Sequence, residues 1–195
     1  MSEFLIYFKL GIDHILDIDG YDHLLFLVAL CCPFIFREFK HVVWLVTAFT
    51  IGHSITLVMA TFDLFTINSE LVEFIIPVTI VLAALSNLKN AGVRASDSDK
   101  GLFKLILVFI FGLVHGMGFS NYLRQLLGKE ESIFTPLLGF NLGIEAAQVL
   151  VIFIFLMFAG IMTNIIGIKR KDWAISISSA IIAFASMLVV SAKFW

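Results

Sequence analysis

Four of the five histidines in this chain lie inside, or at the edge of, strongly apolar segments. His23 precedes the run Leu-Leu-Phe-Leu-Val-Ala-Leu, and His53 lies in Phe-Thr-Ile-Gly-His-Ser-Ile-Thr-Leu. His115 and Glu145 lie in two further segments of the same kind. An ionisable side chain at the centre of a bilayer costs roughly 2.5–3.5 kcal/mol on insertion scales, so such residues indicate a functional site.

Imidazole and carboxylate groups together indicate metal chemistry. They are the protein ligands of Zn, Ni, Co, Mn and Fe, and the lack of cysteine among them argues against a soft-metal thiolate site. Asp22 either binds the ion directly or holds the imidazole of a neighbouring ligand. We therefore expect a divalent metal ion (Zn, Ni or Co) to be bound by some or all of His14, Asp22, His23, His53, Glu73, His115 and Glu145.

Two polar stripes accompany these residues. Thr47, Thr50 and Ser54 recur at helical spacing before and after His53, and Asn141 and Gln148 flank Glu145 in the same way. Stripes of this kind face the interior of a helix bundle. Their members either line the site or hydrogen-bond one helix to another, which is worth about 0.6 kcal/mol on average.

The composition predicts a membrane protein. The 195 residues are 60% hydrophobic and 14% charged, with a mean hydropathy of +1.02, whereas soluble domains carry about 25% charged residues. The net charge of −2 excludes a basic nucleic-acid surface. The adjacent cysteines Cys31 and Cys32 form neither a C-x-x-C motif nor a disulfide framework, and we expect them to serve as packing residues.

The spacing of apolar runs predicts an all-α fold, a polytopic integral membrane helix bundle forming one domain over residues 1–195. A short interfacial helix is expected over residues 3–16. The fifth run is too long for one straight crossing, so a tilt, break or extension is expected there. The six expected spans are 21–36, 42–62, 71–89, 102–120, 136–166 and 173–193.

Positive charge predicts the orientation of these spans. One set of connections carries nine Lys and Arg residues, and the opposite set, with both termini, carries four. The richer side is expected in the cytoplasm and both termini outside. The nine are Arg37, Lys40, Lys89, Arg94, Lys100, Lys104, Lys169, Arg170 and Lys171; the four are Lys9, Arg124, Lys129 and Lys193.

This orientation places the candidate ligands in one leaflet. Asp22 and His23 begin the first span outside, and His115 lies in the last turns of the fourth. Glu73 and Glu145 follow the outer ends of the third and fifth. Three further carboxylates, Asp13, Asp17 and Asp19, would concentrate cations at this mouth.

These segments together resemble the HupE/UreJ family of bacterial membrane proteins. The resemblance is carried by Gly11-Ile-Asp-His-Ile, Gly20-Tyr-Asp-His-Leu-Leu-Phe-Leu, Phe49-Thr-Ile-Gly-His-Ser-Ile-Thr-Leu, Val72-Glu, Phe111-Gly-Leu-Val-His-Gly-Met-Gly-Phe and Phe140-Asn-Leu-Gly-Ile-Glu-Ala-Ala-Gln. It implies divalent-metal handling in a bacterial inner membrane, in connection with nickel and cobalt supply to hydrogenase and urease.

Three functions remain open from the sequence. The first is a secondary transporter for Ni²⁺, Co²⁺ or a similar ion. The second is an intramembrane zinc hydrolase acting on a lipid or another membrane-embedded substrate, with Glu145 or Glu73 as general base and Ser54 or Asn141 steadying an oxyanion. The third is a structural metal site or a metal sensor. A polar path to the cytoplasm would favour transport, and a closed floor would favour the enzyme.

Overall fold

The computed structural model describes residues 2–18, 20–64, 68–91, 101–127 and 133–192. Within these ranges the chain is helical, with no strand. Asp19 and most of the connection between residues 90 and 100 lie outside the described residues. The helices are α1 (Glu3–Leu16), α2 (Asp22–Cys31), η1 (Phe36–Glu38), α3 (Phe39–Thr61), α4 (Ser69–Lys89), α5 (Gly101–Leu127), α6 (Phe134–Gly160), the π-helical turn η3 (Ile161–Ile165) and α7 (Arg170–Ser191).

Five of these helices are long and apolar enough to cross a membrane: α3 with η1, α4, α5, α6 with η3, and α7. Their outward faces carry exposed apolar side chains such as Leu82, Phe103, Phe158 and Met187, as a lipid-facing surface requires. The chain is therefore a helical membrane protein, as the composition predicts. The long fifth run is helical to Gly160 and passes into the π-helical turn η3 before Gly167 ends it with a positive φ of 84°.

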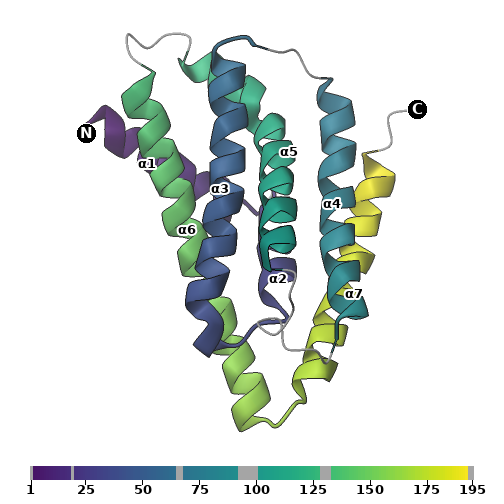
Figure 1. Ribbon diagram of the computed structural model, residues 1–195. Coiled ribbons are helices and arrows are strands. Elements are labelled where there is room, and N and C mark those ends of the chain that lie inside the picture. The colour runs from purple at the N-terminus through teal and green to yellow at the C-terminus, as the bar shows by residue number, and fades with distance from the viewer. Residues whose placement is uncertain (1, 19, 65–67, 92–100, 128–132, 193–195) are drawn as a thin grey trace.

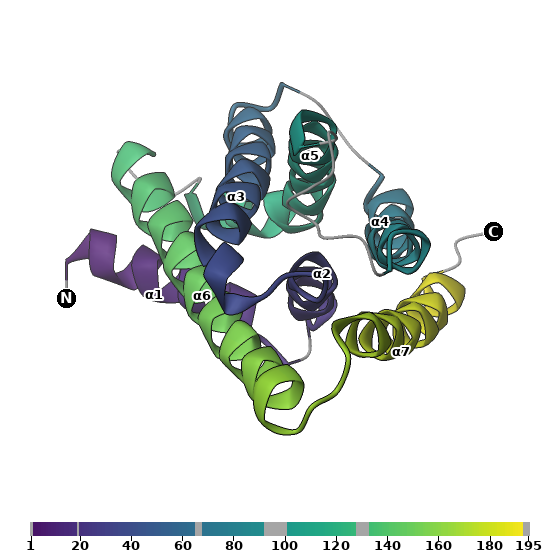
Figure 2. The same cartoon turned by 60° about the horizontal axis from the view of Figure 1, so that its bottom comes forward.

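The expectation of a first span over residues 21–36 is wrong. These residues form the ten-residue helix α2, about 15 Å long and half the thickness of the hydrocarbon core. The helix ends at Cys31, two residues before Pro33, which cannot continue it. Figure 2 shows α2 at the centre of the bundle, enclosed by α3 to α7. Its apolar character on every side reflects burial within the protein and does not reflect lipid contact.

Helix α1 has the expected boundaries, and one side of it packs against α6. Figure 1 shows it slanting into the bundle from the N-terminus, with α2 continuing below it. Gly11 and Gly143 allow this contact, because a Cβ at Gly11 would collide with the carbonyl oxygen of Phe140, and one at Gly143 with that of Phe8. Close approach of backbones at small residues is a common packing mode of membrane helices.

The contact between α3 and α5 is built in the same way. A Cβ at Gly52 would collide with the carbonyl oxygen of Phe109, and one at Gly112 with that of Phe49. Because the two backbones touch here, His53 and His115, which follow Gly52 and Gly112 by one and three residues, are brought to the same depth of the bundle. Helices α4 and α7 pack against one another on the far side of α2.

The ends of the five long helices lie on the two sides of the bundle that the six-span prediction gave them. This holds although α2 is not a span. The C-terminal ends of α3, α5 and α7 lie at one end of the bundle, with the N-terminal ends of α4 and α6 (Figure 1). The grouping of the connections into two sides is therefore unchanged. Which side faces the cytoplasm stays a prediction from the positive charges.

Gly112→Ala should destabilise the bundle. The new Cβ meets the carbonyl oxygen of Phe49, which belongs to rigid backbone and cannot turn away. Overpacking of this kind costs about 1–3 kcal/mol. Gly101→Ala at the start of the same helix is the matched control, because nothing lies within 4 Å of its Cβ. Reversible unfolding in mixed micelles measures the free energy of unfolding of both variants. Equal stability of the two variants would contradict the packing described for α3 and α5.

Candidate metal centre

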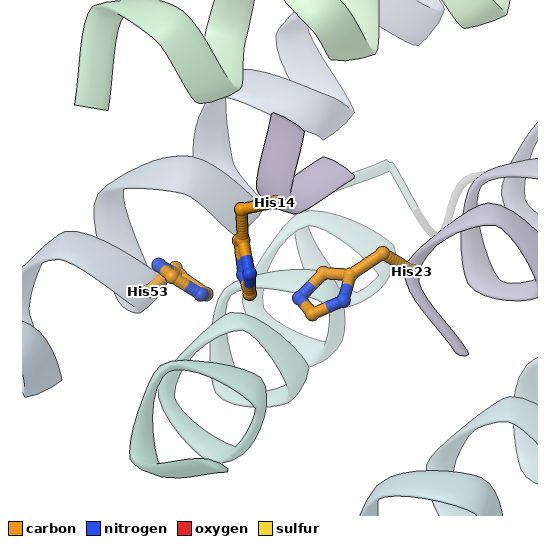
Figure 3. Close-up of side chains that lie close together, drawn as sticks. All are labelled: His14, His23 and His53. Atoms are coloured by element: carbon orange, nitrogen blue, oxygen red, sulfur yellow. The ribbon is translucent and has the colours of Figure 1, made fainter. Parts of the chain in front are cut away.

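Four helices contribute one histidine each to the centre of the bundle. His14 comes from the last turn of α1, His23 from the first turn of α2, His53 from α3 and His115 from α5. The helical chain is broken between α1 and α2, and this break lets His14 and His23 meet. Figure 3 shows His14, His23 and His53 directed toward one another. Together with Asp22, these residues are called the histidine cluster below.

The rings of the cluster lie close together. The ring centroids of His14 and His23 are 4.5 Å apart, those of His23 and His115 are 5.4 Å apart, and those of His23 and His53 are 5.9 Å apart. The ligand atoms of His14, His23 and His53 lie within 4.8 Å of one another, and so do those of Asp22, His23 and His115. Ligand atoms bound to one tetrahedral metal lie about 3.4 Å apart, so small side-chain movements suffice to bind an ion.

Most ring nitrogens of the cluster lack a hydrogen-bond partner among the described residues. The unpartnered buried atoms are Nε2 of His14, Nε2 of His23, both ring nitrogens of His53 and Nδ1 of His115. His53 is fully buried, and His115 is 1% exposed. A buried polar atom without a partner costs about 1–3 kcal/mol, which makes five in one place a strong indication of a missing ligand.

Asp22 orients His23. One carboxylate oxygen, Oδ1, accepts the backbone N–H of His23 at 3.0 Å and lies 3.1 Å from the ring Nδ1. An ionised carboxylate can only accept, so Nδ1 of His23 carries the proton and donates it to Asp22. The lone pair is then on Nε2, the nitrogen that has no partner within the described ranges and is left for the cluster. The carboxylate also gives the cluster one negative charge to balance a divalent ion.

Thr79 on α4 orients His115 in the same way, and sequence reasoning missed it. Its hydroxyl donates to the carbonyl oxygen of Ile76 at 2.7 Å. The same oxygen lies 3.1 Å from Nε2 of His115 and must act there as acceptor. His115 therefore carries its proton on Nε2 and presents the lone pair of Nδ1. A threonine in an apolar helix gives no sequence signal that separates this role from ordinary back-bonding to its own helix.

Phenylalanine rings surround the cluster. Phe119 packs on His14 with ring centroids 4.1 Å apart. Phe26 and Phe49 pack on His115 at 5.2 and 5.1 Å, and Phe26 also contacts Phe111. Phe26, Phe49 and Phe111 are at most 5% exposed. These three rings form an apolar floor beneath the cluster and keep water from that side.

A pocket opens on the other side, beside His14. Its volume is about 650 Å³, and its lining includes His14, Asp13, Asp17 and Tyr122. Asp13 also forms an ion pair with Lys9. Two of the three carboxylates expected at the mouth thus lie in a pocket that also reaches His14 of the cluster.

Glu145 and Glu73 are not among the residues whose ligand atoms meet. Glu145 faces α3, where Thr47 donates a 2.5 Å hydrogen bond to Oε1, and its Oε2 is buried without a partner among the described residues. Glu73 is exposed on α4. The structure thus brings together five of the seven residues expected to bind metal, and leaves these two carboxylates outside the groups they form.

The two polar stripes meet each other and join α3 to α6. Thr50 donates to Oε1 of Gln148 at 2.7 Å, and Ser54 donates to Oδ1 of Asn141 at 2.7 Å. Ser54 also lies 2.7 Å from the carbonyl oxygen of Thr50. These bonds correspond to the interhelical alternative that the sequence left open.

Comparison with protein families agrees with the motifs. The family model described as HupE / UreJ protein matches residues 1–195, the whole chain. The chain therefore belongs to the HupE/UreJ family. Searches of curated proteins and of solved structures found no match.

Thr79→Val should lower metal affinity about 10- to 100-fold, because His115 loses the acceptor that fixes its tautomer. Thr163→Val is the matched control: the Thr163 hydroxyl also donates to a backbone carbonyl of the preceding turn, that of Ala159, but Thr163 lies in η3 away from the cluster. Competition with a chromophoric chelator in detergent measures both affinities. Equal affinities of the two variants would show that Thr79 has no orienting role.

Glu145→Gln should leave metal affinity within about tenfold of the unmodified chain, because the carboxylate is held by Thr47 and is not part of the histidine cluster. Asp22→Ala, which removes the partner of the His23 ring, should lower it by at least about tenfold. Isothermal titration of each purified variant with Co²⁺ provides the comparison. A larger loss in Glu145→Gln than in Asp22→Ala would make Glu145 a ligand.

Proposed function

We propose that this chain binds a divalent transition-metal ion, of the Ni²⁺, Co²⁺ or Zn²⁺ class, at the histidine cluster and carries it across the bacterial inner membrane. The observation that supports this most strongly is the set of buried ring nitrogens that find no hydrogen-bond partner among the described residues. Imidazole and carboxylate groups favour metals of this class. Membership of the HupE/UreJ family suggests a nickel or cobalt accessory role.

The proposed route begins at the pocket beside His14. Asp13 and Asp17 attract the hydrated cation, and the imidazoles of the cluster replace its water. The break between α1 and α2 supports this proposal, since discontinuous helices frame the ion sites of many secondary transporters. Asp22 in the first turn of α2 offsets the positive end of that helix dipole, which would otherwise repel the ion.

In this mechanism the ion can pass the apolar floor of Phe26, Phe49 and Phe111 only after a conformational change. Phe26 and Phe49 stack at 4.7 Å beneath the cluster, and an ion cannot pass them without losing all its ligands. We infer alternating access, in which the pocket side closes before the floor opens. The charge distribution favours an outside position for the pocket and both termini.

An intramembrane zinc hydrolase is the second candidate, and the closed floor below an open pocket favours it. Zinc held by the cluster would lower the pKa of a bound water to about 7. The proposed base and oxyanion donor are less well supported. Glu145 is engaged by Thr47, Ser54 is engaged by Asn141, and Glu73 is exposed. The substrate of this hydrolase would be a lipid or another membrane-embedded molecule.

The double variant His53→Ala/His115→Ala should lose about one metal ion per chain, because it removes two ligands from the centre of the cluster. His41→Ala is the matched control, since His41 lies on α3 like His53 but is exposed. Metal analysis of the purified proteins checks the loss. Equal metal content in all three proteins would overturn both candidate functions.

Proteoliposomes then separate the two candidates. Transport predicts uptake of ⁶³Ni or ⁵⁷Co that is retained in His41→Ala and lost in the double histidine variant. Stoichiometric metal without uptake would contradict transport and leave the hydrolase as the better account.

A further inference from the structure

The histidine cluster is closed toward the pocket as well as toward the apolar floor. Of the cluster, only His14 contributes to the described lining of the pocket. Its Nε2 is nevertheless buried and has no partner among the described residues, as are Nε2 of His23, both ring nitrogens of His53 and Nδ1 of His115. The pocket therefore reaches the His14 ring without reaching the nitrogen that would bind an ion. A part of the protein must move before an ion can enter.

Phe119 of α5 separates the pocket from the cluster. Its ring packs on His14 with centroids 4.1 Å apart, and it also lines the pocket. Phe119 stacks on Phe140 of α6, with ring centroids 5.1 Å apart and ring planes 5° apart, and the Phe140 ring lies 5.7 Å from that of His14. These two phenylalanine rings thus form an apolar barrier on the pocket side. Phe119 follows His115 by about one helical turn.

Of the groups that enclose the cluster here, Phe119 has space to move. The backbone of α1 is held against α6, because Gly11 and Gly143 let the two helices touch. Phe140 is fully buried, so its ring cannot leave its place without repacking the core. Phe119 is only half-buried, and the pocket beside it has a volume of about 650 Å³. Its ring can therefore turn into the pocket by a change of rotamer.

We propose that Phe119 is the pocket-side gate of the histidine cluster. Rotation of its ring into the pocket exposes Nε2 of His14 to an arriving ion, and return of the ring closes the cluster again. In alternating access, this closure is the step that precedes opening of the apolar floor. The gate acts on the metal site and in that respect rests on the proposed function. The access that it controls exists in the chain without metal as well.

Water reports the gate in the absence of any metal. Mass spectrometry measures the exchange of imidazole C2–H groups with D₂O in the chain in detergent. His53 is fully buried and should exchange more slowly than the exposed His41. Phe119→Ala should raise the exchange rate of His53 about fivefold or more and leave that of His41 unchanged, because water passes the missing ring and binds the unpartnered nitrogens. Phe103→Ala is the matched control, since Phe103 lies on the same helix, is 65% exposed and does not line the pocket.

The kinetics of metal binding provide the second test. In stopped-flow mixing with Co²⁺, Phe119→Ala should raise the association and dissociation rates about tenfold or more and change the Kd less than about threefold, because a gate alters the barrier and none of the ligands. Phe119→Trp should slow both rates, and it covers the case in which the alanine variant fails to fold. Rates that do not depend on the size of residue 119 would overturn the gate.

The two measurements separate failure of the gate from failure of the proposed function. An unmodified chain that binds no Co²⁺ contradicts metal binding at the cluster, and the exchange of His53 then still tests the gate. Equal exchange rates of His53 in the unmodified chain, Phe119→Ala and Phe103→Ala would overturn the gate, even where Co²⁺ binds normally.

Discussion

The central constraint in this molecule is the burial of imidazole nitrogens that have no hydrogen-bond partner in the part of the chain that the structure describes. The apolar interior of the bundle does not hydrogen-bond to these nitrogens. Their burial therefore costs free energy until a hydrogen-bond donor or a metal ion binds to their lone pairs. Asp22 and Thr79 determine which nitrogens are left, because each accepts a hydrogen bond from the ring N–H of one histidine and leaves the lone pair of the opposite nitrogen without a partner among the described residues. A divalent cation can bind one nitrogen of each ring, and the carboxylate offsets part of its charge.

The bundle geometry follows from bringing these rings together. His53 and His115 meet because glycines let α3 and α5 touch along their backbones. His14 arrives because glycines let α1 lie directly against α6. The break after α1 and the short length of α2 then place His23 between them. A helix running unbroken from α1 through α2 would have separated His14 and His23 by more than two turns, about 13 Å.

Much of this arrangement was predictable from the sequence, and the exceptions have physical causes. Periodicity and length predicted α1 and the five long helices, because lipid-facing helices must be apolar over a fixed length. They failed for α2, since a short helix buried on all sides has the same apolar composition as a span. Residue type, together with a place in or beside an apolar segment, was enough to select the four histidines and Asp22, which the structure brings together.

The carboxylates and Thr79 show the limit of that reasoning. The stripe containing Glu145 was correctly placed on an inward face, but a helix at the edge of a bundle has several such faces, and this one meets α3 through Thr47. The sequence predicts Glu73 in the same leaflet as the site, but its side chain is exposed on α4. The role of Thr79 depends on which ring lies beside it, which only the packing of α4 against α5 determines.

Diffraction at the cobalt absorption edge from crystals grown with one equivalent of Co²⁺ tests the central claim most directly. The account predicts an anomalous peak within bonding distance of His23 and at least two of His14, His53 and His115. A peak elsewhere, with the ring nitrogens of the cluster bonded to ordered water, would contradict it.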